Sequence, residues 1–278
     1  MSVDQAEPAV GGTESDSPAS AKLYVIPGSH ACRTGMLLLE HKGIAYKTIE
    51  LPTGAHPMML KLLGFAGNRE PIRTVDGRTH PSLAIIDRLG TVPALRYGGQ
   101  RIQTNSEIIR FLERIRPEPP LYPADQDLRR AVEDAQQWGD ETFQMAARRI
   151  TLAAGLHGPS ALYAGGARGR LGALLAHWAP VRRVSNIVAG RLAFKAGGAN
   201  EAAQLAALPA LLDRIDGWIA AGVLNGAELN AADFVIAPSL ALLSYRLDLR
   251  GDLEARPCFA LLERVLPEPE PEPEPLAA

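Results

Sequence analysis

Cysteine is scarce in this chain of 278 residues, which contains only Cys32 and Cys258. Two cysteines this far apart cannot build a disulfide framework or a zinc cluster, and their ordinary setting is a reducing compartment. The six histidines are scattered along the chain without the spacing that metal ligands show. The sequence therefore predicts neither a disulfide scaffold nor a metal site.

An excess of charge of one sign is also missing, because 29 basic and 31 acidic side chains leave a net charge of −2. Such a balance lacks the positive surface with which proteins bind nucleic acid or an anionic membrane. The longest apolar stretch, Phe234 to Leu243, is interrupted by Pro238 and is shorter than the ~20 residues that span a bilayer. The first twenty residues lack the basic segment and the apolar segment that a secretion signal contains. We therefore expect a cytoplasmic protein without nucleic-acid or membrane partners.

Proline and small polar residues divide the chain. Residues 1–20 are rich in glycine, serine and acidic residues, and residues 267–275 alternate proline with glutamate, so we expect a disordered leader over residues 1–20 and a disordered tail over residues 267–278. A proline-rich stretch, residues 117–123, cannot form regular structure and indicates a domain boundary. We expect one domain over residues 21–117, a linker over 118–126, and a second domain over 127–266.

The first domain combines strand and helix patterns in the order β-α-β, a long connection, and β-β-α. This is the order of a thioredoxin-like α/β domain. The connection, residues 52–90, contains one helical pattern over residues 58–63. We expect strands over residues 22–27, 44–51, 91–95 and 101–104, and helices over residues 32–41 and 106–114.

The second domain shows apolar residues at helical spacing throughout, with glycine-rich breaks between the helices. It is therefore predicted to be an all-α helical bundle. The expected helices cover residues 128–152, 171–178, 202–221, 231–245 and 258–266.

Four motifs in this order resemble the glutathione transferases. They are KLYVIPGSHACRTGMLLLEHKGIAY, TVPAL, TNSEIIRFLER and LNAADFVIAPSLALL. The resemblance covers residues 21–266. It implies the glutathione-transferase fold, glutathione as cosubstrate, a homodimer, and an enzyme of detoxification that transfers alkyl or aryl groups from a small electrophile to the thiol.

The resemblance also implies where the thiol is held. In TVPAL the family's proline follows a cis bond, and the backbone of Val92 before Pro93 pairs with the cysteinyl part of glutathione. In TNSEI the matching serine, Ser106, and the residue before it hold the γ-glutamyl end. That preceding residue is Asn105 here, where the family usually has glutamine or glutamate. Ser106 is also a good N-cap, and a helix N-terminus binds anions through free N–H groups.

The turn before the first helix offers two candidates for catalysis. Ser29 lies where zeta-like members carry a catalytic serine and omega-like members a cysteine, so its hydroxyl would donate a hydrogen bond to the glutathione thiolate. The helix N-terminus would lower the pKa of that thiol further. Cys32, next to Arg33, would share this potential and could itself be a nucleophile of lowered pKa. Alternatively, Cys32 is a small buried residue. We favour Ser29, and we expect His30 to be a solvated loop residue.

Two other functions remain open at this point. A thiol–disulfide reductase would work through Cys32, and a non-catalytic binding or scaffold protein could use the same fold. The last motif is structural: Asn230 and Asp233 form a predicted capping box, with a hydrophobic staple between Leu229 and Phe234.

Overall fold

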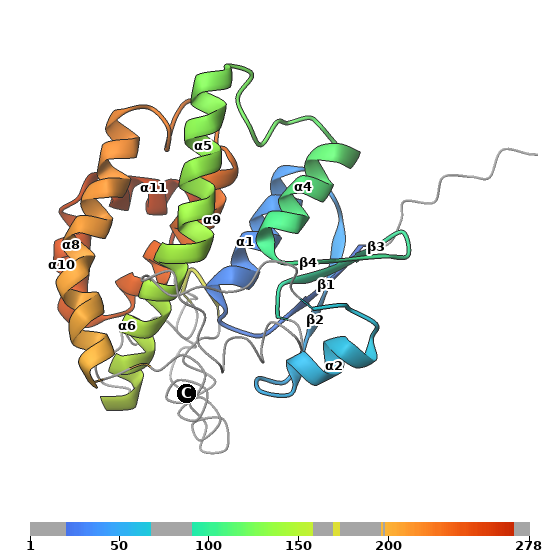
Figure 1. Cartoon of the computed structure of the whole chain (residues 1–278), viewed down its shortest axis with the longest axis horizontal. Helices are drawn as coiled ribbons and strands as arrows, with labels where there is room; N and C mark the ends of the chain where they lie inside the picture. The colour runs from blue at the N-terminus through green and yellow to red at the C-terminus, as the bar shows by residue number, and fades with distance from the viewer. Residues whose placement is uncertain (1–20, 68–90, 158–168, 173–195, 197, 270–278) are drawn as a thin grey trace, which may run out of the picture.

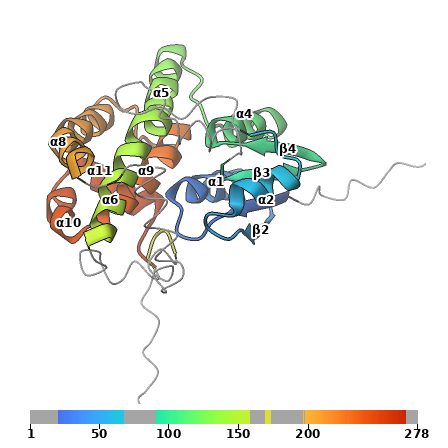
Figure 2. The same cartoon turned by 60° about the horizontal axis from the view of Figure 1, so that its bottom comes forward.

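The computed structural model describes residues 21–67, 91–157, 169–172, 196 and 198–269 (Figure 1). The predicted leader, residues 1–20, lies outside the described residues. So do most of the connection, most of the helix expected over residues 171–178, and the tail from residue 270 on. In the described part, an α/β unit and a helical unit lie side by side (Figures 1 and 2).

The α/β unit is built on a four-stranded mixed sheet. Its strands are β1 (Ala21–Val25), β2 (Tyr46–Glu50), β3 (Ala94–Tyr97) and β4 (Gln100–Gln103). Their order in the sheet is β2-β1-β3-β4, with β1 and β2 parallel and the other two pairs antiparallel. This arrangement confirms the predicted thioredoxin-like order of elements.

Helices cover both faces of the sheet. Helices α1 (His30–His41) and α4 (Asn105–Ile115) lie on one face and α2 (His56–Leu62) on the other (Figure 1). Successive side chains of a strand point to opposite faces. Leu23 accordingly belongs to the large core with α1 and α4, and Tyr24 packs in a second cluster with Leu60 of α2.

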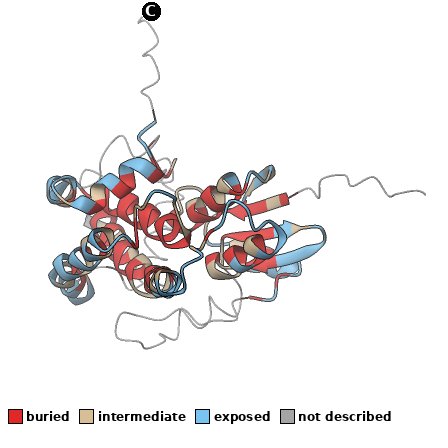
Figure 3. Cartoon of the chain, turned by 90° about the horizontal axis from the view of Figure 1, so that it is seen from above, coloured by how far each residue is buried: buried red, intermediate tan, exposed pale blue. Residues whose placement is uncertain are grey.

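The helical unit surrounds one buried helix. Every residue of α9 (Ala231–Ser244) is buried, and α9 packs against α1, α5, α6 and α11, as the run of buried residues through the centre of Figure 3 shows. The other helical elements are α5 (Gln126–Trp138), the π-helical turn η1 (Gly139–Phe143), α6 (Gln144–His157), α8 (Gly198–Ala220), α10 (Leu247–Glu254) and α11 (Pro257–Val265). The predicted all-helical second unit is confirmed. None of the helices in the described ranges has the length and apolarity needed to cross a membrane.

Two expectations about single elements were wrong, and one helix was not predicted. The expected helix over residues 128–152 is two α-helices joined by η1, where Gly139 lets the chain approach α9 closely: a Cβ there would lie 2.8 Å from Val235 Cγ1. The helix expected from Leu171 does not begin there, because residues 169–172 form a turn closed by a bridge between Gly169 and Gly172. Helix α10 was not predicted, since Leu253 is its only buried residue and leaves little apolar pattern.

Candidate functional site

The six candidate site residues gather at one edge of the sheet. Tyr24, near the carboxyl end of β1, pairs with Ala94 at the start of β3, and Ala94 pairs with Gln103 at the end of β4. The turn after β1, the residues before β3 and the residues after β4 therefore share this edge. The sequence placed Ser29 and Cys32 in the first of these segments, Val92 and Pro93 in the second, and Asn105 and Ser106 in the third.

Ser29 is the N-cap of α1. Gly28, at a φ of 70°, turns the chain after β1, and Ser29 then adopts an extended backbone conformation. The Ser29 Oγ accepts a hydrogen bond of 3.3 Å from the backbone N–H of Cys32. Because the oxygen serves as the acceptor in this cap, the hydroxyl hydrogen can be donated to another group. Ser29 is half-buried, so a ligand at this edge can reach it.

Cys32 lies in the first turn of α1 but is only 1% exposed. Burial raises the pKa of its thiol to about 11, although hydrogen bonding to Ser29 and to the Ile26 backbone and the charge of Arg148 act in the opposite direction. The expectation of a lowered pKa is therefore wrong, because desolvation of the thiolate outweighs the helix N-terminus. The geometry agrees with the alternative interpretation of Cys32 as a small buried residue.

His30 is the first residue of α1 and not a solvated loop residue, since it is 4% exposed. Burial holds the pKa of its imidazole well below the usual value, and the Arg148 guanidinium lowers it further, while a hydrogen bond with the Gln144 backbone acts the other way. The imidazole is therefore neutral near pH 7. The sequence did not indicate this, because Gln144 and Arg148 come from α6, more than a hundred residues later.

Val92 and Pro93 precede β3, which begins at Ala94 and not at Thr91 as expected. The reason is that Pro93 has no N–H for a strand ladder and that the Thr91 carbonyl accepts a hydrogen bond from the Gln103 side chain instead. The Val92–Pro93 bond is cis, as the resemblance implied. Pro93 is buried against α1, where a Cβ on Gly35 would lie 3.2 Å from the Pro93 Cβ.

Gln103 is a positioning residue that the sequence analysis missed. Its Oε1 accepts from the Gly67 N–H at 3.0 Å, and its Nε2 donates to the Thr91 carbonyl at 2.9 Å. The side chain is 7% exposed and thus fixes the two described ends of the connection between α2 and β3. The sequence feature that could have indicated this role is the amide side chain at the last position of the second hairpin strand, next to the TNSEI motif.

The start of α4 differs from the prediction in its cap. Thr104, not Ser106, is the N-cap: its hydroxyl accepts from the Glu107 N–H at 3.3 Å, and its φ is 72°. Ser106 lies one residue inside the helix and donates to Asp140 Oδ2 at 2.8 Å. Asn105 is 5% exposed, and its Oδ1 has no hydrogen-bond partner among the described residues. The first turn of α4 thus presents an unused acceptor beside backbone N–H groups.

A cavity of about 360 Å³ opens on the β2 side of this edge. Ser29, Cys32 and Arg33 line it from the start of α1, and Glu50 lines it from the end of β2. Val92, Pro93, Asn105 and Ser106 do not line it, because they lie on the β3 and β4 side. Ser29 therefore stands between the cavity and the other four candidates.

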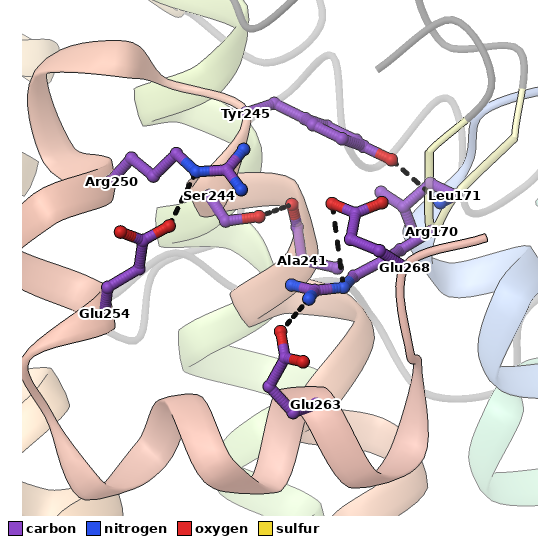
Figure 4. A network of polar contacts seen from close by, with 9 residues as sticks. All are labelled: Arg170, Leu171, Ala241, Ser244, Tyr245, Arg250, Glu254, Glu263 and Glu268. Carbon is purple, nitrogen blue, oxygen red and sulfur yellow. Dashed lines mark hydrogen bonds and ion pairs between the residues drawn. The ribbon is translucent and has the colours of Figure 1, made fainter. Parts of the chain in front are cut away.

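The wall opposite α1 comes from the helical unit and from residues that follow α11. Arg170 pairs with Glu263 and Glu268, and the Leu171 N–H donates to the Tyr245 hydroxyl at 2.8 Å (Figure 4). Arg170 also lies over the Phe259 ring, 5.4 Å from its centroid. These contacts fix residues 169–172 to the helical unit. Gly169 to Gly172, Pro267 and Pro269 complete the lining of the cavity.

The described residues contain no group of three or more histidine, cysteine, aspartate or glutamate side chains that could hold a metal ion. The chemistry of the donors at this edge is that of hydroxyl, amide, backbone N–H and guanidinium groups. Such donors suit a ligand with carboxylates and a thiolate.

Residues 23–120 match the family model described as the N-terminal domain of glutathione S-transferase. No curated protein sequence matches the chain significantly. Several solved structures align with most of the chain. The beta-etherase LigF from Sphingobium sp. strain SYK-6 does so at 17% identity over 88% of this chain and 94% of its own, with a TM-score of 0.57.

Two further structures align similarly. A glutathione S-transferase of Ceriporiopsis subvermispora in complex with glutathione is 21% identical over 92% of this chain and 100% of its own, with a TM-score of 0.56. Glutathione transferase GSTFuA3 from Phanerochaete chrysosporium is 16% identical over 90% and 97%, with a TM-score of 0.58. Residues 23–120 therefore match the N-terminal domain of the glutathione S-transferases, and the described part of the chain has the glutathione-transferase fold.

Proposed function

We propose that the protein is an enzyme that binds glutathione or a similar low-molecular-weight thiol and directs its thiolate at a small electrophile. The thiol lies over the starts of β3 and α4, its sulfur points to Ser29, and the electrophile occupies the cavity on the β2 side. The observation that carries this proposal is the place of Ser29, between the cavity and the residues expected to hold the thiol.

Ser29 stabilises the thiolate in this proposal. Its oxygen accepts the N–H of Cys32, so its O–H is donated to the sulfur of the cosubstrate. The N-terminus of α1 adds positive potential, and both effects lower the pKa of the bound thiol. The sulfur then bonds to an electrophilic carbon, and the leaving group departs with its electron pair. The protein supplies thiolate stabilisation and proximity, and it forms no covalent intermediate.

Asn105 and Ser106 hold the γ-glutamyl end in this proposal. The unpartnered Oδ1 of Asn105 accepts a hydrogen bond from the γ-glutamyl amine, and the first-turn N–H groups of α4 bind its carboxylate. Val92, just before buried Pro93, pairs through its backbone with the cysteinyl part of the thiol. The relative from Ceriporiopsis subvermispora was solved with glutathione, which supports this choice of thiol.

The test is equilibrium binding of reduced glutathione by calorimetry, together with the pKa of the bound thiol from its ultraviolet thiolate absorbance. We expect wild type to bind glutathione and to lower the pKa of its thiol. Ser29→Ala should still bind glutathione, but the acid dissociation constant of the bound thiol should fall about tenfold or more, as expected when one oriented hydrogen-bond donor is removed. Ser29→Thr keeps a hydroxyl for both the cap and the sulfur and should restore the shift.

Cys32→Ala is the matched control, because it changes the neighbouring residue of the same turn. We expect it to keep the lowered thiol pKa. Loss of activity in Cys32→Ala with an unaffected Ser29→Ala would instead favour a thiol–disulfide reductase. If wild type does not bind glutathione at millimolar concentration, the glutathione proposal is wrong and a scaffold function gains support.

We also propose that the protein is a homodimer in the cytoplasm and that its reaction is one of detoxification. Light scattering during size-exclusion chromatography tests the first part, with a mass of about 60 kDa expected from the 29.8 kDa chain. A mass equal to that of one chain would contradict it.

A further inference from the structure

The cavity beside Ser29 contains an arginine that has no acidic partner among the residues that the structure describes. Arg33 lies in the first turns of α1 and forms no ion pair with any residue that the structure describes. Its Nε is buried without a hydrogen-bond partner, and its Nη1 contacts only the Met36 sulfur, at 3.7 Å, within the described ranges. A guanidinium that is half-buried and unpaired is a ready partner for an anion.

A second arginine reaches the same cavity from the opposite wall. The side chain of Arg170 is 2% exposed, and its charge is balanced by Glu263 and Glu268. Its Nη1 nevertheless has no hydrogen-bond partner among the described residues. A buried donor without a partner costs free energy unless a ligand satisfies it. Arg170 can therefore add a hydrogen bond to an anion that Arg33 attracts.

The rest of the lining limits what the anion can be. Most of it is apolar, and the carboxylate of Glu50 is exposed at the rim. A doubly charged group such as a phosphate would meet one unbalanced cation and one repelling carboxylate. A carboxylate carries a single charge, and its two oxygens match the planar donor fork of arginine. The apolar lining residues include Val25, Ile26, Pro27, Met36, Leu171 and Pro267.

We propose that this cavity selects electrophiles that carry a carboxylate on an apolar body. The carboxylate lies between Arg33 and Arg170, the apolar body packs against Met36 and Leu171, and the reacting carbon faces Ser29. This inference rests on the proposed function for its chemistry, since the thiolate must come from the cosubstrate. The binding of the carboxylate does not require the thiol.

The first experiment therefore measures binding alone, by calorimetry with phenylacetate and with phenylacetamide, which has the same shape without the charge. We expect wild type to prefer phenylacetate, and Arg33→Gln to bind it about tenfold more weakly while phenylacetamide is unaffected. Arg96→Gln is the matched control, because Arg96 is exposed on β3 and does not line the cavity. The proposal would be overturned by any of three results: wild type binds the two probes equally, wild type does not bind phenylacetate, or Arg33→Gln binds phenylacetate as tightly as wild type does.

The second experiment uses glutathione with 4-(chloromethyl)benzoate and 4-(chloromethyl)benzamide. In both, the sulfur bonds to the benzylic carbon and chloride leaves with the electron pair, so nothing is oxidised or reduced. Each kcat/KM value is divided by the uncatalysed rate of the same compound, and we expect the resulting value to be higher for the benzoate than for the benzamide. The ratio of benzoate to benzamide should fall about tenfold in Arg33→Gln but not in Arg96→Gln. Turnover of both compounds without preference overturns the inference and leaves the proposed function standing. If wild type binds phenylacetate as expected but does not bind glutathione, the anion site is supported and the proposed function is wrong.

Discussion

Asp233 closes the N-terminus of the buried helix α9. It is fully buried, and its carboxylate accepts the N–H groups of Asn225 at 2.8 Å and of Asn230 at 2.9 Å. Asn230 in turn accepts the N–H groups of Ala232 and Asp233, so the capping box predicted from the sequence is confirmed. Burial raises the pKa of Asp233 to about 6, although the two backbone hydrogen bonds and Arg264 act to lower it.

This pKa makes a prediction about stability and pH. Because the pKa of about 6 in the folded protein is above the ordinary value of 3.8, the folded state holds the proton more tightly than the unfolded chain. The free energy of unfolding that Asp233 contributes is therefore largest below pH 4 and falls as the pH rises to about 6. Urea denaturation between pH 4 and 7 should show wild type losing stability relative to Asp233→Asn over this range.

The control for this prediction is Asp127→Asn, which changes a 90% exposed aspartate in the first turn of α5. The difference in unfolding free energy between Asp127→Asn and wild type should not change between pH 4 and 6 in the way expected for Asp233→Asn. A difference between wild type and Asp233→Asn that does not depend on pH would contradict the assignment.

For single residues, the sequence predicts roles that depend on neighbours in the chain and misses roles that depend on contacts with distant residues. The cap at Asn230 was predicted from residue type and position at a helix start, whereas Ser29 was predicted only as the donor to the thiolate and is also the N-cap of α1. The raised pKa of Cys32 comes from its burial, and the imidazole of His30 is buried where Gln144 and Arg148 of α6 act on it. Ser106 was predicted as a cap, but Asp140, 34 residues away, binds its hydroxyl instead.

Lys42 joins three elements at the C-terminal end of α1. It is 1% exposed, and its Nζ donates to Glu113 Oε2 of α4 at 2.7 Å and to the carbonyls of Pro117 and Pro119 at 3.1 and 2.6 Å. All three donors of the ammonium group are therefore used. This one side chain fixes α1, α4 and the proline-rich segment that follows α4.

Lys42→Met should consequently be strongly destabilising. The substitution removes the cation and leaves Glu113 and two carbonyls without their partner, which costs about 3 kcal/mol of unfolding free energy for a buried pair. Chemical denaturation measures this loss, and Lys47→Met, on the exposed side of β2, is the matched control with an effect of less than about 0.5 kcal/mol. Equal stability of the two variants would show that the buried pair is not needed.

Among the elements, regular patterns were predictable and local irregularities were not. The strands and helices of the α/β unit have the predicted order because period-2 and period-3.6 patterns are intrinsic to the chain. The π-helical turn at Gly139 follows from contact with α9, which no local pattern records. The start of β3 depends on Gln103, a residue of another strand.

The two units share one core through α9. Helix α9 packs against α1 of the α/β unit as well as against α5, α6 and α11, and the rings of His41 and Phe234 lie 4.9 Å apart. Residues of both units belong to one continuous apolar cluster. We therefore expect the units to unfold together and not one after the other.

Two probes on different units can test this. All three tryptophans follow residue 137, so their fluorescence reports on the helical unit. In a Cys258→Ala background, Cys32 is the remaining thiol and reports on the α/β unit through its reactivity with a thiol reagent, which burial suppresses in the folded state. The midpoints of the two transitions in urea should coincide. Separate midpoints would show that the units fold independently.

The bond between Ser106 and Asp140 links the proposed γ-glutamyl position to an aromatic cluster in the helical unit. Trp138 lies two residues before Asp140, stacks on Phe143 with ring centroids 5.3 Å apart, and meets Trp218 edge-on. A ligand that draws the Ser106 hydroxyl away from Asp140 alters the surroundings of Trp138. The molecule thus contains an optical indicator of occupancy, and its own fluorescence can report on ligand binding in the adjoining unit.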